Sequence, residues 1–203
     1  MRFTVSPLVV TAIIFKVALA GPISKRWSGL SCGKVFDNTN GLGYSNSHGN
    51  PNALLGKKFS EKGQWQVTQL EDGAETLNVD IRHCHSSYLK TTSDTSRTFV
   101  KIFLAEDNNK CLQRHDSLPS SNPNATTHIT IEDCSNVDDA TQIRQFWSFF
   151  TENGTNNQTI SPIVKTNGEF VVLDLILSKT SPPALLASRT NPDPDAGLSA
   201  ITY

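Results

Sequence analysis

From Ser31 onward the sequence lacks any run of ten or more residues with the i, i+3, i+4, i+7 apolar spacing of an amphipathic helix. Short apolar or alternating runs stand in its place, at Trp65–Leu70, Leu77–Ile81, Phe99–Leu104 and Phe170–Leu173. The dipeptides Asn40-Gly41, Asp72-Gly73 and Asn167-Gly168 supply residues that tolerate the positive φ of tight hairpin turns. The missing helices and the hairpin signals together predict an all-β domain.

Motifs that mark common catalytic sites are also missing. The chain has no glycine-rich phosphate loop and no carboxylate pair in a context typical of a glycosidase. Gly29-Leu30-Ser31-Cys32-Gly33 has the spacing of the hydrolase nucleophile elbow. That elbow needs a buried strand before the serine and a helix after it, and neither is predicted here. We therefore expect no enzymatic activity and no cofactor.

No metal site is expected either. A strand through His83-Cys84-His85 would place both imidazoles on one face and the sulfur on the other. We therefore expect the sulfur to form a disulfide and not to bind a metal together with the imidazoles. Asp138-Asp139, near Glu132 and Asp133, could attract a cation, but loop carboxylates this close together are more often solvated.

The apolar run in the N-terminal segment is shorter than the about 20 consecutive apolar residues that a membrane-spanning helix needs. Its apolar run Leu8–Phe15 ends at Lys16 and is followed by the small-x-small pattern Ala18-Leu19-Ala20. These features are typical of a secretory signal peptide over residues 1–20. We expect a secreted, extracellular protein with no membrane span.

A dibasic pair, Lys25-Arg26, follows the expected cleavage point and predicts a short propeptide over residues 21–26. The mature domain would then cover residues 27–203 and start at Trp27, with Gly21 as the alternative first residue. Removing residues 1–26 takes away four basic residues and no acidic ones, which leaves 14 basic against 19 acidic and a net charge of −5. A surface of that sign disfavours polyanions, so nucleic acid is not expected as a partner.

Only four cysteines are present, and in an exported chain they predict two disulfides, for which three pairings exist. The mature length suits one domain with its own core. Three sequons, at Asn124, Asn153 and Asn157, lie in polar stretches that we expect to form exposed loops and to carry N-linked glycans.

One stretch carries several of these features in a fixed order. Cys111-Leu112 is followed by the alternating run Ile129–Cys134 and then by Gln145-Phe146-Trp147. This order resembles one repeat of the ricin B-type lectins, whose fold is the β-trefoil. The resemblance implies an all-β chain folded as a disulfide-stapled β-trefoil of three degenerate repeats.

Internal similarity supports this interpretation. Val79-x-Ile81-x-x-Cys84 superposes on Ile129-x-Ile131-x-x-Cys134 at an offset of 50 residues, and Val172–Leu175 resembles the start of a worn third copy. We expect three units, at 27–95, 96–160 and 161–203. Pairing within units favours the disulfides Cys32–Cys84 and Cys111–Cys134. A two-sheet sandwich is the competing architecture, because short strands and polar turns fit both.

The resemblance also implies where a sugar would bind, since these lectins hold it with an Asp, a stacking ring and a polar residue near Gln-x-Trp. The second unit has Gln113 in the Asp position and Arg144 before Gln145, and the third keeps Asp174 without a later aromatic before Tyr203. The candidate carbohydrate contacts are therefore Asp174, Gln113 and Asp116, with His115 in the same expected exposed loop. Gln145 and Trp147 are expected to be structural.

These features favour a secreted, non-catalytic protein that binds carbohydrate or a glycoconjugate through a degenerate site. Incomplete sets of contacts should bind simple galactosides weakly or not at all. The alternative is a trefoil that binds an extracellular protein, as a protease inhibitor or a secreted effector does, because fold alone does not choose between the two.

Overall fold

The computed structural model describes residues 30–34, 41–45, 51–71, 74–90, 97–116, 118, 122, 124–151, 158–190 and 197–201. Within these ranges the chain is all-β except for one short 3-10 helix, η1 (Ala140–Gln145). The strands are β1 (Leu30–Lys34), β2 (Gly41–Ser45), β3 (Pro51–Phe59), β4 (Trp65–Gln69), β5 (Glu75–Thr76), β6 (Val79–Ser86), β7 (Arg97–Leu104), β8 (Lys110–Arg114), β9 (Thr126–Asp133), β10 (Trp147–Thr151), β11 (Gln158–Thr166), β12 (Glu169–Val172), β13 (Asp174–Leu177), β14 (Leu185–Ser188) and β15 (Gly197–Ile201).

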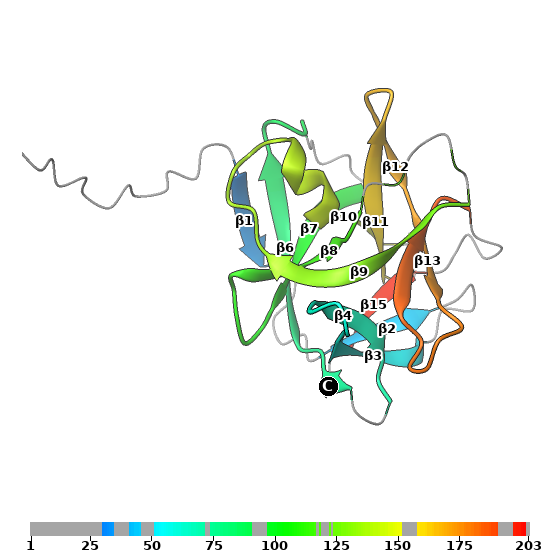
Figure 1. Cartoon of the computed structure of the whole chain (residues 1–203). Helices are drawn as coiled ribbons and strands as arrows, with labels where there is room; N and C mark the ends of the chain where they lie inside the picture. The colour runs from blue at the N-terminus through cyan, green and yellow to red at the C-terminus, as the bar shows by residue number, and fades with distance from the viewer. Residues whose placement is uncertain are drawn as a thin grey trace, which may run out of the picture.

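The strands pair antiparallel and form a closed path. Pairing runs from β7 through β10, β11, β15, β2, β3, β4, β9 and β8 and returns to β7. β1 lies outside this path and pairs with β6, at the edge of the sheet in Figure 1. Antiparallel neighbours joined by short turns are what the alternating sequence runs predicted.

Three hairpins meet at one place in this path. They are β3–β4, β8–β9 and β13–β14. Their second strands contact one another in turn, because β4 pairs with β9, β9 pairs with β14, and Thr68 of β4 bridges to Ala184 just before β14. The second strands of these three hairpins are therefore neighbours of one another.

The turn between β11 and β12 is the hairpin that the dipeptide Asn167-Gly168 predicted. Asn167 has φ 53° and Gly168 has φ 88°, and Thr166 pairs with Glu169 across the two-residue loop. Positive φ at both central positions matches the right-handed twist of the flanking strands.

One large core fills the interior of the closed path. Trp147 at the start of β10 is its largest fully buried side chain, and Leu112, Ile129, Leu175, Leu185 and Leu198 from five other strands pack in the same cluster. A smaller cluster around Cys84, Phe103, Cys111 and Phe146 lies on the side that both disulfides cover. Trp147 is thus a structural residue that fills the core, as the sequence predicted.

Both predicted disulfides are confirmed. Cys32–Cys84 joins β1 to β6, and Cys111–Cys134 joins β8 to the residue that follows β9. The two imidazoles of His83 and His85 lie on the face of β6 opposite Cys84, with ring centroids 4.5 Å apart, as the strand alternation predicted. Ser31 lies within strand β1, so no strand-to-helix elbow surrounds it.

The predicted superposition of Val79–Cys84 on Ile129–Cys134 is wrong as a structural equivalence. The first segment lies in β6, between β1 and β7, whereas the second runs along β9, between β8 and the strands β4 and β14. Both segments bury alternate side chains next to a cysteine, so their shared pattern reports which face is buried and not which place in the fold the strand takes.

Across the described ranges, no helix has the length and apolar character needed to cross a membrane. The predicted signal peptide (1–20) and propeptide (21–26) lie outside the described residues, as do the sequons at Asn153 and Asn157.

Candidate functional site

Gln145 and Trp147 form a brace around β8, as predicted for structural residues. The Gln145 Nε2 donates to the carbonyl of Asp133 at 2.8 Å, and its Oε1 accepts from the backbone nitrogen of Ser135 at 2.9 Å. The Trp147 Nε1 donates to the carbonyl of Leu112 at 3.3 Å. Both side chains are buried, so they position the strands around them and contact no solvent-borne ligand.

Gln113 belongs to this brace, and its expected place in an exposed loop is wrong. It lies on β8 with only 9% of its surface exposed, and its Oε1 accepts from the Gln145 Nε2 at 3.0 Å. Both faces of β8 are covered, so Gln113 is buried, and its neutral amide satisfies Gln145 without burying a charge. Its one strong acceptor is therefore already used inside the fold.

His115 and Asp116 follow β8 and are accessible, as predicted. The backbone nitrogen of His115 donates to the carbonyl of His128, and the backbone nitrogen of Asp116 donates to the Thr127 Oγ1, each at 2.9 Å. These backbone contacts hold the start of the loop against β9. The Asp116 carboxylate is 74% exposed and lies 4.0 Å from the His115 Nε2. Asp116 is thus a positioned hydrogen-bond acceptor at the surface.

Asp174 begins β13 and is partly buried. It stands opposite Ser188 of β14, and Ser188 in turn stands opposite Thr126 of β9. Two strand spacings of about 4.8 Å place Asp174 roughly 10 Å from the backbone of β9, the strand whose Thr127 side chain accepts a hydrogen bond from the Asp116 nitrogen. Asp174 already has an interaction within the protein. The structure therefore brings these two predicted residues to one sheet without bringing them into contact.

An aromatic pair that the sequence did not indicate lies on the β3–β4 hairpin, and its Trp65 is partly buried against the main core. Phe59 is 56% exposed and packs edge-on against Trp65, with ring centroids 5.3 Å apart. The Lys57 Nζ lies 5.4 Å from the Trp65 ring centroid and forms ion pairs with Glu75 and Glu106 at 3.5 and 2.5 Å. Only the alternation within Trp65–Leu70 could have signalled the pair, and it does not say which face is solvated.

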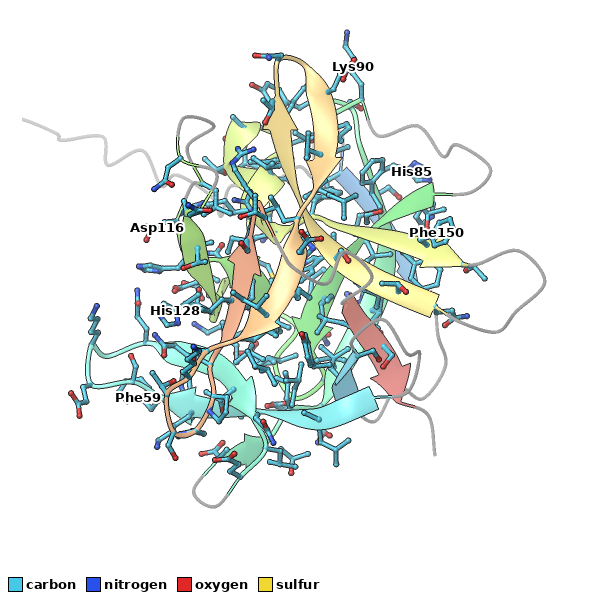
Figure 2. All side chains as sticks on the ribbon, turned by 90° about the vertical axis from the view of Figure 1, so that its right-hand side faces the viewer. Phe59, His85, Lys90, Asp116, His128 and Phe150 are labelled. Atoms are coloured by element: carbon cyan, nitrogen blue, oxygen red, sulfur yellow. A yellow bond between two sulfur atoms is a disulfide. The ribbon has the colours of Figure 1, made fainter. Side chains whose placement is uncertain are left out.

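Lys62 lies in the turn of the same hairpin, close enough to His128 of β9 for its charge to act on that imidazole. Burial lowers the pKa of His128, and the nearby charges of Lys62 and His115 lower it further, while Asp116 opposes them. Figure 2 shows Phe59, His128 and Asp116 along the same side of the molecule. We call this region the hairpin surface; it consists of Phe59, Lys62, Trp65, His115, Asp116 and His128. It combines rings, cations and one carboxylate.

Other polar clusters hold loops in place. The Asp138 carboxylate accepts from the Ser86 Oγ and from the backbone nitrogens of Ser87 and Tyr88, at 2.9 and 3.2 Å for the latter two. Asp139 caps η1 by accepting from the Thr141 nitrogen at 2.8 Å. Both aspartates therefore accept hydrogen bonds from the backbone. The sequence suggested instead that they are merely solvated.

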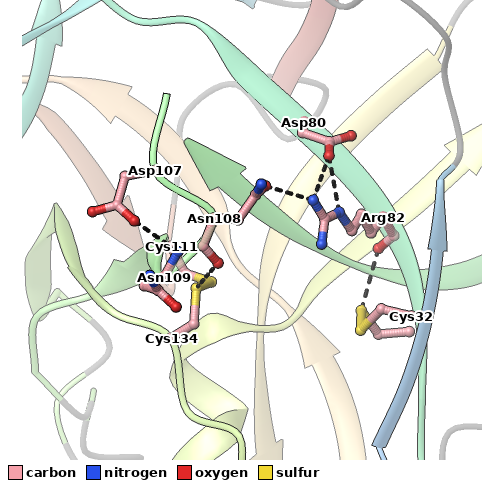
Figure 3. A network of polar contacts seen from close by, with 9 residues as sticks. Cys32, Asp80, Arg82, Asp107, Asn108, Asn109, Cys111 and Cys134 are labelled. Atoms are coloured by element: carbon pink, nitrogen blue, oxygen red, sulfur yellow. Dashed lines mark hydrogen bonds and ion pairs between the residues drawn. A yellow bond between two sulfur atoms is a disulfide. The ribbon is translucent and has the colours of Figure 1, made fainter. Parts of the chain in front are cut away.

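A third cluster ties the β7–β8 turn to β6 (Figure 3). The Arg82 Nη2 donates to Asp80 at 2.6 Å and to the Asn108 Oδ1 at 2.5 Å, while its guanidinium lies 4.3 Å from the Phe103 ring centroid. Among the described residues, no group of three or more His, Cys, Asp or Glu side chains is arranged to hold a metal ion.

Asn124 is exposed in the turn before β9, where its Oδ1 accepts from the Thr190 Oγ1 at 3.4 Å. The sequon therefore lies on an accessible turn, as predicted, and a glycan there is sterically possible.

Comparison with known proteins finds no matching family model, no matching curated protein and no matching solved structure.

Proposed function

We propose that the chain is a secreted, non-catalytic carbohydrate-binding protein with a β-trefoil fold. The hairpin surface is the site at which it recognises the saccharide. The observation that carries this proposal is the exposed ring of Phe59, packed against the partly buried Trp65, on the same side of the molecule as the carboxylate of Asp116.

The trefoil part of the proposal is supported by the threefold recurrence of strand pairing. The hairpins β3–β4, β8–β9 and β13–β14 contact one another in turn, and the remaining long strands close the path around a single core. A trefoil needs three such units because none buries its apolar face alone. This grouping puts the boundary between the second and third units before β11, whereas the sequence put it at residue 160, inside that strand.

Saccharide binding is supported by the chemistry of the hairpin surface. An apolar ring face stacks on the C–H face of a pyranose, and fixed carboxylates accept hydrogen bonds from sugar hydroxyls. Phe59 and Trp65 offer the rings, and Asp116 offers the acceptor. Gln113 is buried within the brace, so the proposed contacts shift from Gln113 to these residues, with Asp174 at the margin of the same sheet.

A glycan array probed with the purified, disulfide-bonded protein tests this proposal. We expect selective binding that Trp65→Ala and Asp116→Ala each reduce by about tenfold, the effect of roughly 1.4 kcal/mol. Phe150→Ala is the matched control, because Phe150 is 40% exposed on β10 and lies outside the hairpin surface. Binding to no glycan, or binding that both substitutions leave unchanged, would contradict the proposal.

Protein binding is the second candidate, and a different patch favours it. Tyr88 and Val137 are 52% and 60% exposed, and Asp138 holds their two loops together through its contact with the Tyr88 nitrogen. An exposed apolar patch whose loops are fixed by hydrogen bonds to Asp138 fits a protein partner. An array without glycan binding, combined with a partner whose binding is lost in Tyr88→Ala, would favour this function instead.

A further inference from the structure

Three arginines converge on the loop that follows β8. The Arg144 Nη1 donates to the carbonyl of His115 at 2.8 Å, and the Arg189 Nη2 donates to the carbonyl of Leu118 at 2.7 Å. The Arg114 Nη1 lies 3.4 Å from the carbonyl of Asp116. These three carbonyls lie within four positions of the chain, and the charges of Arg144 and Arg189 both act on Arg114, so the three guanidinium groups lie close together.

No carboxylate of the described residues compensates this charge. None of the ion pairs between described residues involves Arg114, Arg144 or Arg189. The Nε atoms of Arg114 and Arg189 are buried without a hydrogen-bond partner. Arg114 is only 1% exposed, and burial together with the charges of the other two arginines lowers its pKa to about 10. Each guanidinium brings a positive charge to this place, because arginine is not deprotonated in proteins.

Buried charges in proteins are normally paired, because removing an ion from water is costly. Backbone carbonyls satisfy some of the N–H groups here but carry no negative charge to offset three cations. Arg144 and Arg189 are partly exposed, so an ion arriving from solvent can reach them. The arginine fork matches the geometry of oxyanions such as sulfate and carboxylate.

We propose that Arg144 and Arg189, backed by the buried Arg114, form a binding site for an oxyanion group, and that an anionic saccharide, sulfated or carboxylated, carries this group. The oxyanion site stands on the arginine geometry alone, whereas the saccharide rests on the proposed function.

The site is compatible with the acidic balance of residues 27–203. A net charge of −5 for residues 27–203 keeps long polyanions away, but a local group of like charges still creates a field that attracts a single small anion. The Asp116 carboxylate is 74% exposed and pairs with His115, and none of the ion pairs between described residues joins a carboxylate to the three arginines.

Nuclear magnetic resonance of the arginine side chains tests the site without any substitution. Sodium sulfate is titrated into the purified protein while sodium chloride keeps the ionic strength constant. We expect the Nε–H signals of Arg144 and Arg189 to shift and saturate, while the signal of Arg82, already paired with Asp80, stays in place. Shifts that never saturate, or that affect Arg82 equally, would overturn the proposal.

Sulfate binding by arginine variants, and a comparison of three ligands, complete the test. Arg144→Gln and Arg189→Gln, which keep an N–H donor for the loop, should each weaken sulfate binding about tenfold or more. The control Lys179→Gln removes one exposed charge from the turn after β13 and should change it less than about twofold. Sulfate binding that persists in both arginine variants would refute the site. Galactose 6-sulfate should bind more tightly than either sulfate or galactose; if it binds no better than sulfate, the oxyanion site stands and the saccharide assignment fails.

Discussion

Lys101 is a buried cation at the centre of the smaller core cluster. Its side chain is fully buried on β7, its Nζ donates to the carbonyl of Ser135 at 3.0 Å, and the rings of Phe103 and Phe146 lie about 6 Å away. Burial lowers its pKa from 10.5 to about 8. Between these two pH values the unfolded chain binds more protons than the folded chain, so the free energy of unfolding rises with pH across this window.

We predict that Lys101→Met stabilises the protein at pH 7. The shift from 10.5 to about 8 corresponds to roughly 3 kcal/mol, from which the unpaired Ser135 carbonyl subtracts about 1 kcal/mol. Urea denaturation of both proteins from pH 6 to 10.5 measures the difference. The gap should be constant below pH 8 and should shrink towards pH 10.5. A variant that is less stable than the parent at pH 7 would contradict this assignment.

Gln145→Ala should destabilise the fold by about 1–3 kcal/mol, because it leaves the Gln113 Oε1, the Ser135 nitrogen and the Asp133 carbonyl without their partner. Gln64→Ala, in the turn of the β3–β4 hairpin, is the control and should change stability by less than about 0.5 kcal/mol. Urea midpoints report the difference if the slope of the transition stays constant. Equal midpoints for the two variants would show that the brace is not needed.

At the scale of strands, two glycines with ordinary backbone angles meet different surroundings. A Cβ on Gly56 of β3 would lie 2.7 Å from the Glu75 carbonyl and 2.9 Å from the Leu70 Cδ1, because β5 packs closely there. A Cβ on Gly33 of β1 would meet nothing within 4 Å. Gly56 therefore marks a close approach of strands, and Gly33 does not.

We predict that Gly56→Ala lowers the free energy of unfolding by about 1–3 kcal/mol, since the backbone of β5 must shift. Gly33→Ala should be neutral or stabilising by up to about 1 kcal/mol, because it reduces the freedom of the unfolded chain. Thermal unfolding of the two single variants compares them directly. A tolerated Gly56→Ala would indicate that β5 does not pack against β3 in solution.

Strand existence was predictable from local pattern, and strand position was not. The runs Trp65–Leu70 and Phe99–Leu104 are short and rich in apolar residues, and both form strands, of which Phe99–Leu104 is buried on both faces. The same signal could not distinguish β6 from β9, because pairing partners far along the chain decide where a strand lies. For the same reason Gln113 was assigned to the surface, although its exposure depends on Gln145, 32 positions later.

The candidate site was predictable only in part, for a related physical reason. His115 and Asp116 follow a strand end and were expected at the surface. The hairpin surface and the arginine cluster each combine residues from separate hairpins, so no contiguous stretch contains them. A sequence shows cysteine pairs and turn dipeptides directly, whereas convergence of charges from β8, η1 and β14 requires the folded arrangement.

For the whole molecule, we expect the secreted form to begin at Trp27, after removal of the signal peptide and of the segment that ends in Lys25-Arg26. Mass spectrometry of material collected from the culture medium identifies the first residue, and Gly21 would mean that the dibasic pair is not cut. An intact Met1 would remove the basis for assigning an extracellular location.

The attachment of β1 has a consequence for association between molecules. β1 pairs only with β6 among the described strands, and Cys32–Cys84 is the covalent link between them. Replacing both cysteines by serine leaves a detachable terminal strand and, when it detaches, a newly open edge on β6. Such an edge accepts the equivalent strand of a second chain. The double variant should therefore form strand-exchanged dimers at high concentration. In the parent protein the Cys32–Cys84 disulfide prevents this exchange by keeping β1 paired with β6 of the same chain.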